Sequence, residues 1–240
     1  AFDLSSITPN HHVAALSWTA LTETDTTISA AINLMLSQNV KNGLAALENF
    51  YAPSVNFLLV DFEKMAIKTV GKMPKRSPLN ETQGRMPSLG WKPENSWRGY
   101  WGYEVNPIIK SSPGDVLANT NNKISDEKFP KHMSHFWGDT QRILRLQKLM
   151  QNREVHTRES CIGAQLDTIS PTARALLPIV GSELWYSQPM GEAGSIERLR
   201  FDALSMLASW NGEMSEHLPE PLIYSTWMKF LQKKLIDDDL

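Results

Sequence analysis

The spacing of apolar residues changes near residue 155, and this change limits the possible folds more than any other feature of the sequence. Before it, short β-rich runs alternate with segments that have helical spacing. After it, nearly every segment from residue 157 to residue 236 has the period of an α-helix. Thr157 can cap one of these helices, and Pro171 stands where a first helical turn tolerates proline. We therefore predict a mixed α/β domain over residues 1–155 and a helical subdomain over residues 156–240.

Strands are expected at four places in the first domain. The runs "SVNFLLVD" and "KMAIKTVG", around the turn "DFEK", predict a hairpin with strands at 54–61 and 65–70. Residues 13–18 have two apolar faces, as a fully buried strand does. A fourth strand is expected to lead into Asn121. Apolar residues with helical spacing predict two helices between the first strand and the hairpin.

Residues 72–109 have a different character from the rest of the chain. Five prolines punctuate them, and five tryptophans and tyrosines stand between the prolines. Disordered segments are poor in aromatic residues, so this stretch is predicted to be a long ordered loop. Loops of such length inside a domain are usually functional.

Charge, cysteine content and motifs exclude several classes of protein. The formal net charge of −2 gives no basic surface for nucleic acid, and no apolar run is long enough for a transmembrane helix. Cys161 is the only cysteine, and we expect it to be a small buried hydrophobe rather than a nucleophile. His132 and His135 lack a third ligand at a supporting spacing, which argues against a metal site. No phosphate loop, serine-hydrolase elbow or zinc-protease motif is present.

Three asparagines lie within four positions of the run "ANTNN": Asn119, Asn121 and Asn122. Asparagine is an ordinary turn residue, because its side chain bonds nearby backbone and it tolerates left-handed conformations. An amide at the end of an apolar run is also a neutral hydrogen-bond donor that a rigid fold could aim at a ligand. The residues by themselves leave both interpretations open.

Seven segments, in order along the chain, resemble one protein family. They are "ALSWTAL", "FYAPSVNFLLVD", "GKMPKR", "GWKPENSWRGYWGYEVNP", "PGDVLANTNNK", "HFWGDTQRILRL" and "AQLDTISPTARALLP". Together they are similar to the β-chain of the penicillin amidase (penicillin acylase) family of N-terminal-nucleophile hydrolases, from about Val13 to about Ile236. The resemblance implies an α+β fold: part of an α/β/β/α sandwich, followed by a mostly helical subdomain.

The resemblance also implies roles for particular residues. Asn121 matches the asparagine whose side chain stabilises the oxyanion of the tetrahedral intermediate, a task that needs a rigid donor aimed at developing charge. Arg142 matches the arginine that holds this asparagine, so the two side chains are expected to meet. Trp18 and Val55 match positions of the acyl-binding pocket, and either Phe136 or His135 matches a third.

The family's catalytic serine is the first residue of the β-chain, and this sequence contains no match to it. Ala1 is not a nucleophile, and its position suggests a cut made by processing or by design. We therefore expect a central fragment of an acylase whose parent hydrolyses linear amides, such as the side-chain amides of penicillin or acyl-homoserine lactones. The fragment alone is expected to be inactive. The alternative is a non-catalytic structural or interaction fragment.

Further expectations concern cofactors, partners and location. No cofactor is implied. Some family members bind calcium through an aspartate shortly after the residue matched by Pro130; here Met133 or a neighbour replaces it, which predicts no calcium. The implied partners are the rest of the β-chain and the α-chain of the same autoproteolytic precursor, together with a small-molecule amide. The fragment alone is expected to self-associate through uncovered apolar surface and sheet edges. By resemblance the parent protein is periplasmic or secreted.

Overall fold

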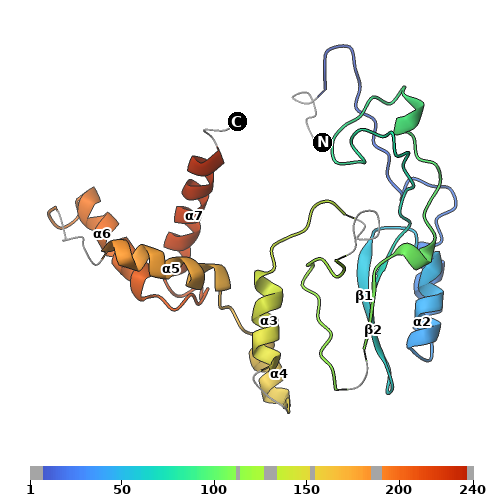
Figure 1. Cartoon of the computed structure of the whole chain (residues 1–240). Helices are drawn as coiled ribbons and strands as arrows, with labels where there is room; N and C mark the ends of the chain where they lie inside the picture. The colour runs from blue at the N-terminus through green and yellow to red at the C-terminus, as the bar shows by residue number, and fades with distance from the viewer. Residues whose placement is uncertain (1–7, 112–113, 127–133, 152–154, 185–190, 237–240) are drawn as a thin grey trace. The chain divides into compact units, whose positions relative to one another are not determined.

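The structure is a computed structural model of the 240-residue chain, and it describes residues 8–111, 114–126, 134–151, 155–184 and 191–236 (Figure 1). The chain divides into two compact units, residues 1–138 and 139–240. This division lies earlier than the expected domain boundary near residue 155. The helix that follows Asp139 therefore belongs to the second unit and not to the first.

The first unit is built on a three-stranded antiparallel sheet with the order β1-β2-β3. The predicted hairpin is confirmed. In β1 and β2, Val55 pairs with Val70 at one end and Val60 pairs with Met65 at the other. The turn between them is held by Asp61, whose carboxylate accepts the backbone N–H groups of Glu63 and Lys64, each at 2.8 Å. The strands span β1 (Val55–Val60), β2 (Met65–Val70) and β3 (Ile108–Ser111).

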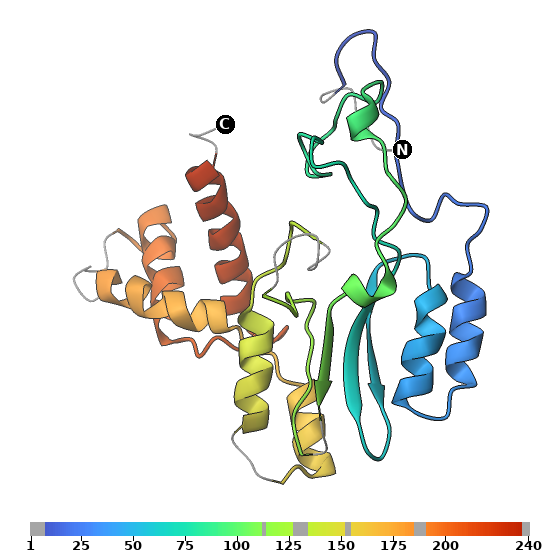
Figure 2. The same cartoon turned by 45° about the vertical axis from the view of Figure 1, so that its right-hand side comes forward.

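Two helices precede the hairpin, as the sequence predicts, and they cover one face of the sheet (Figure 2). They are α1 (Thr27–Met35) and α2 (Val40–Ala46), and α2 continues into a short 3₁₀ turn, η1 (Leu47–Asn49). The side chain of Asn39 caps α2 by accepting the N–H of Asn42 at 2.9 Å. The core between the helices and the sheet consists of buried Ala30, Leu47, Phe50 and Val70, with Leu34, Phe57, Leu59 and Tyr103 packed against it.

The alternation of residues along β1 and β2 gives the sheet two different faces. Phe57 and Leu59 point toward the helices and join the core. Asn56 and Leu58 alternate with these two residues along β1. They therefore point to the opposite face, because successive side chains of a strand alternate. Their partners across the hairpin, Thr69 and Ile67, lie on that same face. The second face carries the candidate site.

Two of the expected strands are not formed. Residues 12–18 have no regular structure, and Val13 and Leu16 are 91% and 76% exposed. A strand is stable only when its backbone N–H and C=O groups pair with a neighbour, and no paired segment lies alongside these residues within the described parts of the chain. Strand β3 ends at Ser111, and the described residues 114–120, which lead into Asn121, also have no regular structure.

The long loop after β2 is ordered, as predicted, and contains only the short turns η2 (Pro93–Asn95) and η3 (Tyr103–Val105) before β3. Its two arms are joined by backbone hydrogen bonds, such as Trp101 N–H to Met73 C=O at 2.9 Å. Lys68 fastens the loop to the sheet, because its ammonium group donates to the carbonyls of Asn106 at 2.7 Å and Tyr103 at 3.1 Å. This lysine is 4% exposed, and burial lowers its pKa below the ordinary value.

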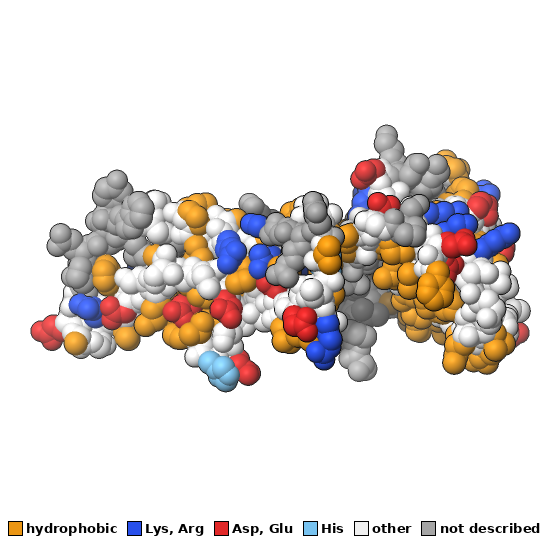
Figure 3. Space-filling view, turned by 90° about the horizontal axis from the view of Figure 1, so that it is seen from below, with side chains coloured by type: hydrophobic (Ala, Val, Ile, Leu, Met, Phe, Trp, Pro, Cys, Tyr) orange, Lys and Arg blue, Asp and Glu red, His pale blue; other side chains and the backbone are white. Residues whose placement is uncertain are grey.

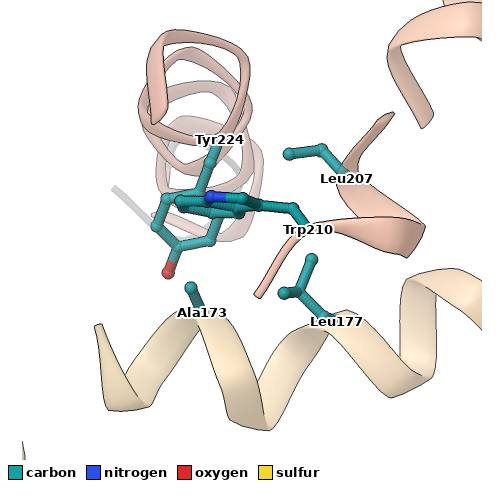
Figure 4. Close-up of a cluster of buried hydrophobic side chains, with 5 residues drawn as sticks. All are labelled: Ala173, Leu177, Leu207, Trp210 and Tyr224. Atoms are coloured by element: carbon teal, nitrogen blue, oxygen red, sulfur yellow. The ribbon is translucent and has the colours of Figure 1, made fainter. Parts of the chain in front are cut away.

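The second unit is helical, which confirms the prediction for residues 157–236. Thr157 caps its helix in a reciprocal capping box with Ser160. A core of Ala173, Leu177, Leu207, Trp210 and Tyr224 joins three of the helices (Figure 4). The helices are α3 (Gln141–Gln151), α4 (Arg158–Gln165), α5 (Pro171–Leu184), α6 (Ile196–Ser209) and α7 (Glu220–Ile236). Within the described ranges, no helix has both the length and the apolar character needed to cross a membrane.

Many apolar side chains lie on the surface (Figure 3). On α1, Ile28, Ile32 and Met35 stand at helical spacing and are 73%, 53% and 84% exposed. Such a row is usually covered by another surface. Cys161 is also exposed, so the expectation that it would be a small buried residue was wrong. It lies on α4, which contributes no buried residue.

Candidate functional site

A pocket of about 840 Å³ lies on the second face of the sheet, opposite the helices. Its floor is the β1–β2 hairpin, and its walls come from the asparagine run and from the residues just before Asp139. All of these residues lie in the first unit. The pocket is lined by Ser54, Val55, Asn56, Leu58, Ile67, Thr69, Asn119, Asn121, Ser134, Phe136, Trp137 and Gly138.

The polar residues that line the pocket are joined by a series of hydrogen bonds. Thr69 Oγ1 donates to Asn56 Oδ1 at 2.6 Å. Asn56 Nδ2 donates to Asn119 Oδ1 at 3.0 Å, across 63 positions of sequence. Asn119 Oδ1 also accepts the backbone N–H of Asn121 at 3.1 Å. The sheet is thereby connected to the loop that carries Asn121.

The asparagine run is a tight turn held by its own amides. Asn122 Oδ1 accepts the N–H of Thr120 at 3.0 Å, and Asn119 Nδ2 donates to the carbonyl of Asn122 at 3.2 Å. Asn119 and Asn122 thus bond the backbone, as an ordinary turn predicts. Asn121 has a φ of 68°, in the left-handed region that asparagine adopts more readily than most residues. Asn121 itself is exposed and lines the pocket.

Three of the five residues singled out from the sequence come together here. Asn121, Val55 and Phe136 all line the pocket, although they are far apart in the chain. His135, the other candidate for the third pocket position, is not among the lining residues.

Trp18 and Arg142 are placed elsewhere. Trp18 is 51% exposed, lies at the end of the irregular segment 12–18, and does not line the pocket. Arg142 is the second residue of α3, in the other unit. Its expected contact with Asn121 therefore stays a prediction.

None of the lining residues in the described part of the chain is ionisable, so the described lining of the pocket is electrically neutral. Its apolar lining residues are Val55, Leu58, Ile67, Phe136 and Trp137. The geometry suits an uncharged ligand with an apolar part and a carbonyl or amide group. In the parts of the chain that the structure describes, no group of three or more His, Cys, Asp and Glu side chains is placed to hold a metal ion. Pro130 and Met133, on which the expectation about calcium rests, lie outside the described residues, as does His132.

Sequence reasoning missed Asn56 and Thr69. The sequence carried a signal for Asn56, which is a polar residue inside the apolar run "VNFLLV", but none for Thr69, because threonine is an ordinary strand residue and here follows Lys68. The predicted turn "DFEK" sets a register in which these two residues face each other, which is the pairing observed. Their link to Asn119 had no signal in the local sequence, since it joins distant segments.

The chain was compared with known proteins. It matches the family model described as penicillin amidase over residues 4–240. The acyl-homoserine lactone acylase QuiP of Pseudomonas putida is 24% identical over 222 residues, which cover 90% of this chain and 27% of that protein. The penicillin acylase 2 proenzyme of Pseudomonas sp. strain SE83 is 21% identical over 201 residues, covering 80% of this chain and 24% of that protein.

Among solved structures, a thermostable penicillin G acylase from Alcaligenes faecalis has a similar fold. The TM-score is 0.65 at 18% sequence identity, and the match covers 90% of this chain and 38% of that one. The chain thus spans 27% of the length of the first of these curated relatives and 24% of the second. The shared fold confirms the α+β class predicted from the sequence.

Proposed function

Because this chain belongs to the penicillin amidase family, we propose that it is part of an acylase, in which it supplies the oxyanion-binding side of the active site. The observation that carries the proposal is the convergence of Asn121, Val55 and Phe136 on one neutral pocket. In this proposal the complete protein hydrolyses a linear amide to a carboxylic acid and an amine.

The task of Asn121 follows from the chemistry of amide hydrolysis. Attack on the amide carbonyl moves negative charge onto its oxygen, and a fixed N–H donor aimed at that oxygen stabilises the transition state more than the substrate. The Nδ2 of Asn121 is a neutral donor on a turn whose neighbouring amides bond the backbone. Arg142 supports Asn121 in this proposal, since a guanidinium offers five donors and stays charged.

The nucleophile is proposed to come from outside this chain. Ser54, Ser134 and Thr69 line the pocket, but a hydroxyl needs an adjacent base to become a good nucleophile. Among the lining residues that the structure describes there is no histidine, lysine or carboxylate. This supports the family mechanism, in which an N-terminal serine uses its own α-amine as the base. It also supports the proposal that this chain alone has no turnover.

The acyl group is proposed to lie against the apolar residues that line the pocket, which include Val55 and Phe136. A neutral wall of this kind favours uncharged acyl groups, because burying an unpaired charge is costly. The named relatives are an acyl-homoserine lactone acylase and a penicillin acylase, so both kinds of side-chain amide are candidate substrates.

The proposed partners are the remaining β-chain and the α-chain of one autoproteolytic precursor, in the periplasm or outside the cell. The exposed row on α1 supports a covering partner. The same row favours a second candidate, in which the chain is a non-catalytic interaction fragment. Light scattering of the isolated chain at micromolar concentration is expected to show self-association; a strictly monomeric profile would count against uncovered apolar surface.

The experiment compares the complete protein with the isolated chain on chromogenic anilides of medium-length and aromatic carboxylic acids. The complete protein is expected to release the chromophore, and the isolated chain at the same molar concentration is expected to release none above the buffer rate. If the complete protein turns over no member of the series, the acylase proposal fails. Turnover by the isolated chain would contradict the proposed external nucleophile.

A further inference from the structure

Three hydrogen bonds in series connect the centre of the sheet to the backbone of Asn121. They run from Thr69 to Asn56, from Asn56 to Asn119, and from the N–H of Asn121 back to Asn119. We propose that Thr69 and Asn56 are positioning residues that act on Asn121 through Asn119. This inference rests on the proposed function, since it deepens the role of Asn121 in that site.

The first residue of the series, Thr69, is held firmly by the sheet. Thr69 lies on β2, the central strand of the sheet, and is 5% exposed. Its backbone N–H donates to the carbonyl of Pro107 at 3.0 Å. Asn56 stands directly opposite Thr69 in the β1–β2 register, so the 2.6 Å bond between their side chains joins two fixed positions. Sites held on strands are more precise than sites held on loops alone.

The series also has a direction, which orients each amide. The backbone N–H of Asn121 can only donate, so Asn119 presents its oxygen to it. The same oxygen accepts from the Asn56 NH₂ group, so the Asn56 oxygen faces Thr69 and accepts from its hydroxyl. An Asn119 amide oriented the other way would place its NH₂ group against the Asn56 NH₂ group and the Asn121 N–H, where neither can accept. The Thr69 hydroxyl is the donor that satisfies the Asn56 oxygen and thereby holds the Asn56 NH₂ group toward Asn119.

The consequence for Asn121 is a fixed backbone conformation. Its φ of 68° is uncommon for a residue with a side chain, and the bond from its N–H to Asn119 holds it there. The direction in which Asn121 Nδ2 points depends on how firmly this backbone conformation is held. A catalytic group misplaced by about 1 Å can lose about 10²-fold in rate, so a weakened series is expected to lower kcat rather than substrate binding.

The test uses the complete protein that contains this chain. Thr69→Val has nearly the same shape but lacks the hydroxyl, whereas Thr69→Ser keeps it. Thr24→Val is the matched control, since it removes an exposed hydroxyl of the same unit that bonds only nearby Thr22. For each variant, kcat and KM are measured on a chromogenic anilide, with and without Asn121→Ala. Hydrogen exchange of the backbone N–H of Asn121 is followed by mass spectrometry.

Thr69→Val is expected to lower kcat about tenfold, less than complete loss of an oxyanion donor, while KM changes by less than about twofold. Thr69→Ser and Thr24→Val are expected to retain kcat. In the Asn121→Ala background, Thr69→Val is expected to cause no further loss, because coupled residues are not additive. Exchange of the Asn121 N–H is expected to be faster in Thr69→Val and unchanged in Thr69→Ser.

An unchanged kcat in Thr69→Val, or a tenfold loss that persists in the Asn121→Ala background, would overturn the inference. Failure of the proposed function has a different signature, since the unmodified protein would then hydrolyse no anilide. In that case the hydrogen exchange of the Asn121 N–H still tests whether Thr69 and Asn56 position Asn121. Equal exchange of the Asn121 N–H in the unmodified protein and in Thr69→Val overturns it.

Discussion

The hydroxyl of Thr27 is expected to be one of the most important single groups for the stability of the first unit. Thr27 is the first residue of α1, and its Oγ1 accepts the N–H groups of Tyr51 and Ala52 at 3.0 and 3.1 Å. The same oxygen donates to the carbonyl of Ala52 at 3.2 Å. One side chain thereby fastens α1 to the residues just before β1, where Ser54 and Val55 begin the pocket.

The change Thr27→Val removes all three bonds and keeps the shape of the side chain. Each such bond contributes about 0.5–1.5 kcal/mol net, and the site is only partly buried, so water can replace some of the lost partners. We therefore expect a loss of about 2 kcal/mol in the free energy of unfolding of the first unit. Valine is β-branched like threonine, so helix propensity contributes little to the difference.

Amide hydrogen exchange of β1 and β2 is the appropriate assay, because it reports the first unit without assuming that the two units unfold together. A loss of about 2 kcal/mol corresponds to about thirtyfold faster exchange. Thr27→Ser should retain most of the protection, and Thr24→Val should retain all of it. Exchange less than about threefold faster in Thr27→Val would show that the three bonds contribute little to stability, since each tenfold is about 1.4 kcal/mol.

Three other outcomes are expected. Leu207→Ala, at a core position that is 1% exposed, should lower the free energy of unfolding of the second unit by about 3 kcal/mol, measured by denaturation followed by tryptophan fluorescence. The hydrogen bonds from Arg145 hold the pKa of Asp167 below its ordinary value of 3.8, so this contact should stabilise the unit above about pH 3.8. Stability should fall as the pH drops through the folded-state pKa, and Asp167→Asn should flatten that dependence in denaturation midpoints measured against pH. In a crystal structure of the complete protein, the side chains of Asn121 and Arg142 should lie within hydrogen-bond distance or be bridged by one water; side chains on opposite faces of the fold would contradict this.

The local parts of the fold could be predicted from the sequence because their signals are local. The β1–β2 hairpin follows from two apolar runs around a polar turn, and Asp61 accepts two N–H groups within that turn. The helices of the second unit follow from their period, and Thr157 forms the expected cap. Each of these elements satisfies its own backbone groups or those of an adjacent segment.

The strand expected at residues 13–18 could not be predicted reliably from the local sequence. An apolar run indicates that a segment suits burial, but it does not say whether a partner strand is present to pair with it. Val13 is 91% exposed because no such partner lies beside it in the described structure. The same holds for the apolar row on α1, because helical spacing predicts a helix but does not identify the surface that covers it.

The candidate site was predictable only through resemblance. Nothing in the run "ANTNN" distinguishes a donor from a turn residue, and the structure shows that Asn119 and Asn122 do bond the turn. The meeting of Val55, Asn121 and Phe136 depends on long-range packing, which no local pattern encodes. The hydrogen bond from Asn56 to Asn119 is of the same kind.

If the side chain of Asn121 stabilises the oxyanion, its removal must slow the chemical step. The kcat of Asn121→Ala in the complete protein should then be about 10²–10³-fold lower than that of the unmodified protein, as for loss of one oxyanion donor, with KM little changed. An unchanged kcat in this variant would show that Asn121 is not the oxyanion donor.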